Sequence, residues 1–381
     1  MSLLLSEEQR MVQMMVREFA RKVIKETAME RDQTKAFPKE NLKKMGGLGL
    51  MGMMIPFEYE GAGADTVSYC LALSEIAYAC ASTAVIMSVH NSIVCEAFKH
   101  FGNETQKQTY LCPLAIGKKL GAFALTEPHA GSDPVDQLTT AIRDGDSYII
   151  NGTKRFITSG KNANIIIVTA KTDESKGHKG ISAFIVPQKT KGLIVGHEED
   201  KMGLRASDTV DLIFDQCRVP KENLLGNEGE GFKIAMTVLD SGRIGIAAQS
   251  IGVAQAALDA SIAYSKSRNQ FKRPISAFQN TRFVIAEMAT QIEAARHLML
   301  AAALKKDKGE PFTLEASMAK LFASEMVNQI TAKAIQIHGG YGYIRDYPVE
   351  RYYRDARVFT IYEGTSEIQK IIISNHMLKD R

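Results

Sequence analysis

Residues that form disulfides or metal sites are scarce in this sequence. The chain has five cysteines, an odd number, and no two of them lie close enough to form a zinc or redox motif. The eight histidines are equally scattered, and neither His-Glu-x-x-His nor another ligand pattern occurs. We therefore expect no metal ion. We expect these cysteines to be small core residues: Cys70, Cys80, Cys95, Cys112 and Cys217.

Long hydrophobic runs and a strong charge imbalance are also absent. Charged or small polar residues interrupt the apolar stretches well short of the roughly 18 residues that a membrane span needs. The formal net charge of +4 is small for 381 residues and gives no case for a nucleic-acid partner. The chain starts without a basic leader before the capping sequence Ser6-Glu7-Glu8-Gln9. We expect a soluble, cytoplasmic protein without a membrane span.

The spacing of apolar residues changes twice along the chain. Up to about residue 118 they recur at three- and four-residue steps, as Val12, Val16 and Phe19 do, which is typical of amphipathic helices. From about Gly121 the apolar segments are short and rich in β-branched residues, and from Gly229 long alanine-rich helical patterns return. We expect an α+β protein with three parts: an N-terminal all-α domain (1–118), a middle antiparallel β-domain (119–228) and a C-terminal long-helix bundle (229–381).

The stretch Gly47-Leu48-Gly49-Leu50-Met51-Gly52 satisfies the G-x-G-x-x-G pattern of dinucleotide sites. That pattern needs a strand before it and a helix after it, so that its glycines meet a pyrophosphate at the helix start. Here a helical pattern from Lys39 to Met45 precedes the glycines, and Pro56 and a glycine-rich loop follow. We interpret the motif as a turn between helices and reject a dinucleotide-binding fold.

The dipeptide Asn151-Gly152 predicts a tight turn in the β-domain, because these residues tolerate the positive φ angles of a hairpin. The segments on either side, Ser147–Ile150 and Thr153–Thr158, have the composition of strands. We expect them to form a hairpin. Further strands are predicted at Ala122–Leu125, Ile165–Thr169, Ile181–Val186 and Val210–Phe214.

Glu363 is the strongest candidate for a catalytic residue. It follows the apolar run Val358–Tyr362, and Thr365 then begins a capping pattern for an apolar helix from Ile368 to Ile373. Apolar surroundings would raise its pKa from the usual value of about 4.3, and the helix start would lower it. Such a site can tune a general base for work near neutral pH. On spacing alone, a solvated glutamate in a turn is the commoner alternative.

Five motifs occur in order within the helix, sheet and helix pattern: Leu125–Asp133, Arg155–Thr158, Leu239–Arg243, Gln336–Gly342 and Ile361–Thr365. With them the sequence resembles the acyl-CoA dehydrogenase family over essentially its whole length. Residues 88–92 resemble its short-chain, butyryl-CoA branch. The resemblance implies FAD held between the β-domain and the C-terminal bundle, and oxidation of an acyl-CoA of about four carbons to the trans-2-enoyl-CoA. It also implies electron transfer to an electron-transfer flavoprotein.

The resemblance makes Glu363 the base that removes the proton α to the thioester while the β-hydrogen passes as hydride to the flavin. By similarity, the backbone amide of Glu363 and a ribityl hydroxyl of FAD stabilise the enolate oxygen. In some branches the base comes from the position of Gly242, which has no side chain here. For Arg243, an ion pair within the bundle is the alternative to substrate contact. The residues expected to bind the substrate are Ser132, Asp240, Arg243 and Gly364.

The resemblance also implies a set of cofactor contacts. Phe156 stands where many family members have tryptophan, which keeps an aromatic face and loses an indole donor. Lys272 follows Phe271 where the family usually has glycine. The expected cofactor-binding residues are Phe123, Leu125, Thr126, Gly131, Ser132, Phe156, Ile157, Thr158, Arg268, Phe271, Gln279, Gln336, Gly339, Gly340, Thr365 and Glu367. Of these, Arg268, Gln279 and residues 336–340 match positions that reach the FAD of a neighbouring subunit, so we expect an obligate oligomer, a homotetramer.

Other functions stay open at this point. The same site could run in reverse as an enoyl-CoA reductase. A homologue that has lost the chemistry could bind a partner or nucleic acid, although the intact Glu363 and the weak net charge argue against it. A purely structural helical protein is opposed by the β-domain and the flavin motifs.

Overall fold

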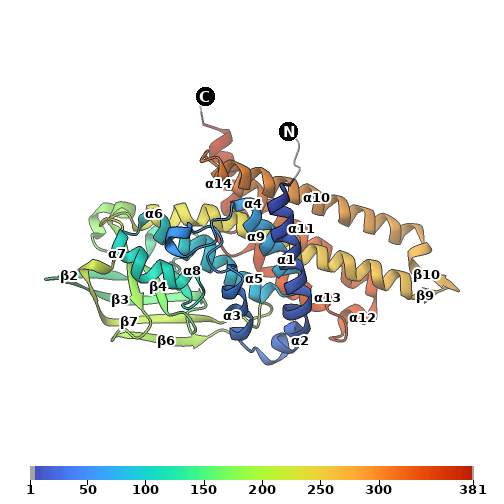
Figure 1. The fold of residues 1–381 in the computed structure, drawn as a ribbon, viewed down its shortest axis with the longest axis horizontal. Helices are drawn as coiled ribbons and strands as arrows, with labels where there is room; N and C mark the ends of the chain where they lie inside the picture. Colours follow the sequence, from blue (N-terminus) through green and yellow to red (C-terminus); the bar gives the residue numbers. More distant parts are fainter. Residues whose placement is uncertain (1–4, 380–381) are drawn as a thin grey trace.

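The computed structural model describes residues 5–379, so the part of the leader prediction that concerns residues 1–4 lies outside the described residues. Helices form both ends of the chain and a β-sheet forms its middle (Figure 1). The expected α+β class is confirmed. The N-terminal helices are α1 Glu7–Phe19, α2 Lys25–Thr34, α3 Lys39–Gly47, α4 Thr66–Ala79, α5 Ala81–Ser88, α6 Glu96–Phe101, α7 Glu104–Gln106 and α8 Cys112–Ala115.

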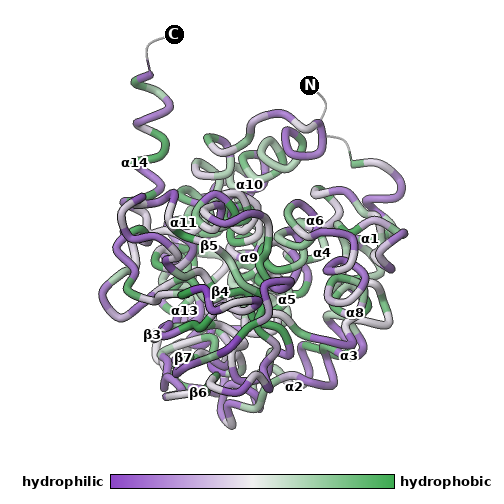
Figure 2. Tube along the Cα trace, turned by 90° about the vertical axis from the view of Figure 1, so that its left-hand side faces the viewer, coloured by the Kyte–Doolittle hydropathy of each residue, from purple (hydrophilic) through white to green (hydrophobic). Residues whose placement is uncertain are grey.

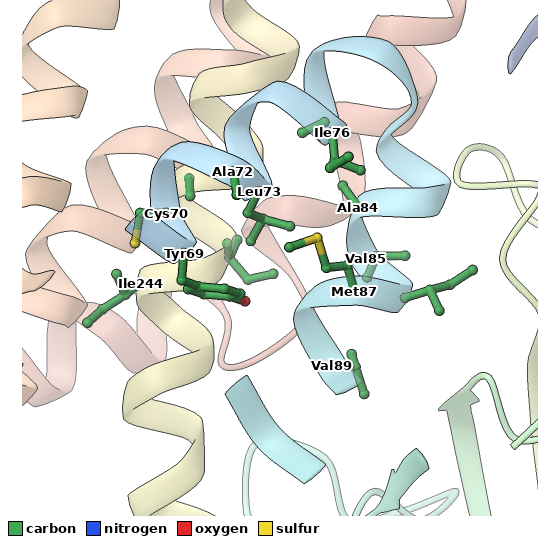
Figure 3. Close-up of a cluster of buried hydrophobic side chains, with 14 of the residues drawn as sticks. Tyr69, Cys70, Ala72, Leu73, Ile76, Ala84, Val85, Met87, Val89 and Ile244 are labelled. Carbon is green, nitrogen blue, oxygen red and sulfur yellow. The ribbon is translucent and has the colours of Figure 1, made fainter. Parts of the chain in front are cut away.

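Two predictions for the N-terminal helices are confirmed. The Ser6 hydroxyl accepts the Gln9 N–H at 3.1 Å, and the Gln9 side chain accepts the Ser6 N–H at 2.9 Å, so the capping box starts α1. The stretch from Gly47 to Gly52 forms turns after α3 and opens no helix. Helix α4 is buried along its whole length, and Figure 3 shows Tyr69 and Leu73 of α4 in one apolar cluster with Ile244 of the C-terminal bundle.

The sheet has eight strands: β1 Gly121–Ala124, β2 Thr140–Asp144, β3 Ser147–Thr158, β4 Ile165–Lys171, β5 Ile181–Pro187, β6 Leu193–Glu198, β7 Thr209–Pro220 and β8 Leu224–Leu225. Their order is β6-β7-β3-β2-β4-β5-β8, with β1 paired to β4. Most neighbours are antiparallel, as expected, whereas β1 and β2 each pair with β4 in parallel.

The hairpin expected at Asn151-Gly152 is wrong. Strand β3 runs unbroken through both residues, and Gly152 lies at a register shift against β7. A Cβ atom at this glycine would lie 2.7 Å from Cα of Thr139, so the residue serves a close backbone approach in a β-bulge. The turn lies earlier, between β2 and β3, where Gly145 has a φ of 61°.

The C-terminal bundle contains α9 Gly231–Ser267, α10 Gln279–Asp307, α11 Thr313–His338, α12 Gly340–Tyr343, α13 Val349–Ala356 and α14 Ser366–Met377, with a small hairpin of β9 Asn269–Gln270 and β10 Arg273–Pro274. Helix α9 packs against α4, α10 and α11, and α14 projects from the body at one end (Figure 2). Within residues 5–379, α9 is the one helix long and apolar enough to cross a membrane, but 72% of its apolar window is buried inside the protein. This burial is typical of a core helix.

Candidate active site

A left-handed turn carries Glu363. Glu363 (φ 52°) and Gly364 (φ 93°) both adopt positive φ angles, which is unusual for a residue with a side chain. The Thr365 hydroxyl then accepts the Ile368 N–H at 3.3 Å and caps α14. The predicted cap is confirmed, and the helix begins at Ser366, two residues before the expected start.

The Glu363 carboxylate is enclosed but unbonded. Its two oxygens are buried and have no hydrogen-bond partner within residues 5–379, although part of the residue stays exposed. Burial raises the pKa of this carboxyl to about 7, and the charges of Lys320 and Arg243 limit the rise. The raised pKa agrees with the expectation from the sequence. The influence that lowers the pKa of Glu363 comes from these two cations and not, as expected, from the start of α14. A carboxyl with this pKa can accept a proton near neutral pH.

Gly242 of α9 lies against this carboxylate. A Cβ atom at position 242 would collide with Oε2 of Glu363 and would lie 3.4 Å from Cδ1 of Ile93. The missing side chain therefore makes room for the base. The two positions considered for the base share one site, and only Glu363 places a side chain in it.

Arg243 and Asp240 form an ion pair one turn apart on α9. Asp240 also accepts a hydrogen bond from the Thr313 hydroxyl at 2.6 Å. The intrahelical ion pair considered for Arg243 is therefore present. The buried Nε of Arg243 has no acceptor within residues 5–379, which leaves a donor for a ligand as well.

The expected cofactor residues between Phe123 and Thr158 lie together where β1 ends beside β3, and we call them the first group. The Arg155 N–H donates to the Thr126 carbonyl at 2.8 Å and joins the two segments. Phe156 lies at a bulge of β3 with a φ of 59°, and the residue is 56% exposed. Ile157 belongs to the buried sheet core, so only its backbone is left for a ligand. Of the others, Phe123, Leu125 and Thr158 are half-buried, and Gly131 and Ser132 are exposed.

A buried lysine, which the sequence did not single out, fixes this loop. Lys154 is 0% exposed, and its Nζ donates to the Leu125 carbonyl at 2.9 Å. It also donates to Oε1 of Glu127 at 2.8 Å and to Oε1 of Gln137 at 2.9 Å. Glu127 in turn accepts the Leu138 N–H at 2.6 Å. The backbone at Leu125 is therefore held by a saturated polar cluster.

The helical segment Val89–Cys95, between α5 and α6, contacts both the sheet and the bundle. The Gly121 N–H at the start of β1 donates to Nδ1 of His90 at 3.2 Å. Burial lowers the pKa of His90 to about 4, which keeps this acceptor neutral. Ile93 of the same segment lies against Gly242. The base and the expected flavin strand therefore have a common neighbour, where the three parts of the chain meet.

The second group of expected cofactor residues lies at the far end of the bundle. Arg268, Gly339 and Gly340 line a groove of about 470 Å³ with Tyr264. Gln270 of the β9–β10 hairpin also lines this groove, and Figure 1 shows the hairpin at the opposite end of the long axis from the sheet. The structure thus separates the two groups. The other members of this group, Phe271, Gln279 and Gln336, are exposed.

Thr365 and Glu367 border a different groove, of about 520 Å³, together with Arg357 and Tyr353. The groove lies over α11, α13 and the start of α14. The Glu367 side chain is exposed, and Thr365 is half-buried with its hydroxyl engaged in the helix cap.

Two residues without a predicted catalytic role hold the turn of the base. Lys320 Nζ donates to the Gly364 carbonyl at 2.7 Å, and Gln369 Nε2 donates to the same oxygen at 3.0 Å. The sequence suggested Gln369 only as part of a helix cap. In the sequence, Lys320 stands out only as the cation in the otherwise apolar run from Met318 to Ala323, which does not show what its nitrogen contacts.

Known proteins resemble this chain in every part. The family model of the acyl-CoA dehydrogenase N-terminal domain matches residues 6–118, that of the middle domain residues 122–217, and that of the C-terminal domain residues 229–378. The fold and these matches define an oxidoreductase. The chain belongs to the acyl-CoA dehydrogenase family, which implies a flavin cofactor.

Individual relatives are similar over nearly their full length. The mitochondrial short-chain specific acyl-CoA dehydrogenase of Mus musculus is 51% identical over 98% of this chain and 91% of that protein. The short-chain specific acyl-CoA dehydrogenase of Clostridium acetobutylicum is 49% identical over 98% of this chain and 99% of that protein. The structure of butyryl-CoA dehydrogenase from Megasphaera elsdenii superposes with a TM-score of 0.98 at 45% identity, over 100% of both chains.

Proposed function

We propose that the protein uses FAD to oxidise a short-chain acyl-CoA to the trans-2-enoyl-CoA and passes the electrons to an electron-transfer flavoprotein. The observation that carries this proposal is the buried, unbonded carboxylate of Glu363, whose pKa of about 7 suits proton removal near neutral pH. The short-chain relatives and the butyryl-CoA dehydrogenase structure support a substrate of about four carbons.

In this mechanism Glu363 takes the proton α to the thioester. Within residues 5–379 the Glu363 N–H has no acceptor, so it can donate to the thioester carbonyl as negative charge develops there. Asp240 and Arg243 would hold the CoA portion through the free Nε–H of the arginine. Bound FAD would supply the acceptor for the β-hydride. Expulsion of water by the substrate would strengthen the hydrogen bonds to the carbonyl.

The residues beside β1 and β3 fit an isoalloxazine ring. Phe156 offers an exposed aromatic face, and Leu125 and Thr126 offer a loop backbone that Lys154 fixes. Thr158, Gly131 and Ser132 would complete this side of the cofactor site, with Thr365 and Glu367 near its other end.

The separation of the two cofactor groups supports an obligate oligomer. Arg268, Gly339 and Gly340 line a groove at the far end of the bundle, where they would contact the FAD of a neighbouring subunit. Large apolar residues are exposed at this end, among them Phe271 (86%) and Tyr343 (86%). We propose a homotetramer built through this end of the bundle.

We also propose the division into units 1–118, 119–228 and 229–381 and a cytoplasmic location. The electron partner is supported by a structural neighbour, a chain of the solved structure of the electron transferring flavoprotein of Acidaminococcus fermentans, with a TM-score of 0.99 and 49% identity over 100% of both chains. The reverse direction, enoyl-CoA reduction, would use Glu363 as the proton donor and would take its electrons from the same partner.

The test is a visible absorption spectrum of the purified protein before and after anaerobic addition of butyryl-CoA. Flavin bands that bleach would support the proposal, and a series of acyl-CoA lengths should then give the fastest bleaching near four carbons. Flavin bands that persist with every acyl-CoA would contradict the reaction. A colourless protein that cannot be reconstituted with FAD would favour the non-catalytic homologue.

A further inference from the structure

Lys320 is a buried cation without a direct ionic partner. Its side chain is 0% exposed, and no carboxylate oxygen within residues 5–379 comes within 4.0 Å of its Nζ. Its one hydrogen bond goes to the Gly364 carbonyl at 2.7 Å. A buried ammonium is costly unless a negative charge offsets it. Lys320 therefore needs a counter-charge near by that does not touch it.

Glu363 is that counter-charge. Burial lowers the pKa of Lys320 to about 8, and the negative charge of Glu363 is the largest influence that opposes this lowering. The other cation near Glu363 is Arg243, which already pairs with Asp240. Lys320 is thus the cation beside the base whose charge no direct ion pair neutralises.

Lys320 also acts on the backbone that carries the base. The Gly364 carbonyl follows directly on Glu363 in a turn where both residues have positive φ angles. Lys320 and Gln369 donate to this one oxygen at 2.7 and 3.0 Å. A strained turn persists when its surroundings fix it. Of the two donors that fix this turn, one carries a charge and the other is neutral.

We propose that Lys320 is a positioning residue for the base of the proposed reaction: its ammonium group fixes the turn of Glu363 through the Gly364 carbonyl and holds an unpaired positive charge beside the carboxylate. Lys320 donates its hydrogen bond to the Gly364 carbonyl and not to Glu363, so both oxygens of the Glu363 carboxylate stay free to accept a proton. This inference rests on the proposed function for the role of Glu363 as a base.

Several charged or titratable groups act on this pair from the surrounding helices. Those that act on it are Arg243 on α9, Glu325 on α11 and Glu367 on α14. Asp240 pairs with Arg243, and burial together with the charge of Glu363 raises the pKa values of Tyr69 on α4 and of the adjacent Tyr362. Every variant below leaves these groups in place, so a change in the titration of Glu363 reports on the altered residue.

The test compares Lys320→Met and Lys320→Gln, which remove the charge, with Gln369→Met, which removes the neutral donor to the same carbonyl. The first measurement is the rate of flavin bleaching by butyryl-CoA as a function of pH. In both Lys320 variants the midpoint of the profile should move up by about one pH unit or more, because a nearby cation favours the carboxylate. In Gln369→Met the rate should fall at every pH while the midpoint stays in place.

The second measurement does not depend on catalysis. The thermal midpoint of each protein is followed against pH beside the same protein with Glu363→Gln, and the difference reports the titration of Glu363 in the folded state. It should show the same upward displacement in the Lys320 variants. An unmoved midpoint in both Lys320 variants, an equal displacement in Gln369→Met, or failure of both Lys320 variants to fold would overturn the proposal.

The two measurements also separate this inference from the proposed function. A wild-type flavin that no acyl-CoA bleaches, together with a Lys320-dependent displacement of the thermal profile, would contradict the proposed function and retain the influence of Lys320 on Glu363. A wild-type flavin that bleaches, with no shift of either pH profile in the Lys320 variants, would support the proposed function and contradict the role of Lys320.

Discussion

Two buried lysine and glutamate couples in this protein are built in opposite ways. In the β-domain, Lys154 Nζ and Glu127 Oε1 are 2.8 Å apart, and both groups have further hydrogen-bond partners. In the bundle, no hydrogen bond or ion pair joins Lys320 and Glu363, and both Glu363 oxygens lack a partner within residues 5–379. We call Lys154 and Glu127, which are hydrogen-bonded to each other, the closed pair. We call Lys320 and Glu363, which are not, the open pair.

The difference shows in the carboxyl groups. Burial would raise the pKa of Glu127, but the charge and hydrogen bond of Lys154 lower it below its ordinary value. At Glu363 burial prevails and the pKa rises to about 7. The lysines behave alike, since burial lowers the pKa of both Lys154 and Lys320 to about 8. Hydrogen bonding to the carboxylate therefore distinguishes the carboxyl whose pKa is lowered from the carboxyl whose pKa is raised.

Breaking the closed pair should have the largest effect on stability. Lys154→Met leaves Glu127 buried without its cation, so the free energy of unfolding should fall by about 3–5 kcal/mol. Urea unfolding of the FAD-loaded protein measures this loss. The control is Lys161→Met, which breaks the exposed pair with Glu198 and should cost less than about 1 kcal/mol. A loss as small as in the control would show that the closed pair is not structural.

The two glutamates should respond to pH with opposite signs. Because the pKa of Glu363 is raised, its contribution to stability is full below about pH 4.5 and is lost as the pH rises through about 7. The free energy of unfolding of Glu363→Gln should therefore rise by about 3 kcal/mol relative to that of wild type over this range. Because the pKa of Glu127 is lowered, its contribution to stability is present above about pH 4.5 and is lost as the pH falls below that value, so Glu127→Gln should lose stability relative to wild type as the pH rises through this acidic range. Thermal midpoints between about pH 3 and 8 cover both ranges, and slopes of equal sign would refute the contrast.

Filling the space beside the open pair should disturb the reaction more than the fold. In Gly242→Ala the new Cβ would collide with the Glu363 carboxylate and displace it. Flavin reduction by butyryl-CoA should slow by about 10- to 100-fold, because a small misplacement of a catalytic group is costly. Stopped-flow bleaching measures the rate. Gly47→Ala, where a Cβ meets nothing within 4 Å, is the matched control and should leave the rate unchanged.

The smallest effect is expected at the β9–β10 turn, far from both pairs. Lys272 has a φ of 62°, a conformation that glycine adopts without strain. Lys272→Gly should therefore change the free energy of unfolding by less than about 1 kcal/mol, since relief of strain is offset by the greater freedom of glycine in the unfolded chain. Urea unfolding provides the value, and a loss well above 1 kcal/mol would mean that the lysine side chain makes a stabilising contact.

Much of the fold was predictable because local patterns and the fold agree. The helical periods of α9, α10 and α11, the capping box of α1 and the cap of α14 all appear in the structure. Strands β2 and β6 were missed, since exposed apolar residues such as Ile142 and Ile194 obscure their alternation, and the two-residue strands β8, β9 and β10 were missed because they are too short to show a period. The hairpin at Asn151-Gly152 failed because a local turn signal cannot reveal the approach of Thr139 from another strand.

Glu363, the candidate base, could be predicted from the sequence, whereas the residues that hold the candidate site in place could not. Glu363 followed from an apolar run before a helix cap, and the family resemblance gave it a role. Lys320 and Lys154 could not be assigned, because the function of a buried lysine depends on the tertiary contact that its nitrogen makes. The family resemblance already placed Arg268 at the FAD of a neighbouring subunit, and the structure adds that β3, which carries Phe156, and the β9–β10 hairpin after Arg268 lie at opposite ends of the long axis (Figure 1).

The central claim is that Glu363 is the base that removes the α-proton of an acyl-CoA. The most direct test is anaerobic flavin bleaching by butyryl-CoA in wild type and in Glu363→Gln, with FAD content and acyl-CoA binding measured on both proteins. The variant should keep FAD and bind acyl-CoA but bleach more slowly by a factor on the order of 10²–10⁴. Bleaching of the variant at the wild-type rate would exclude Glu363 as the base.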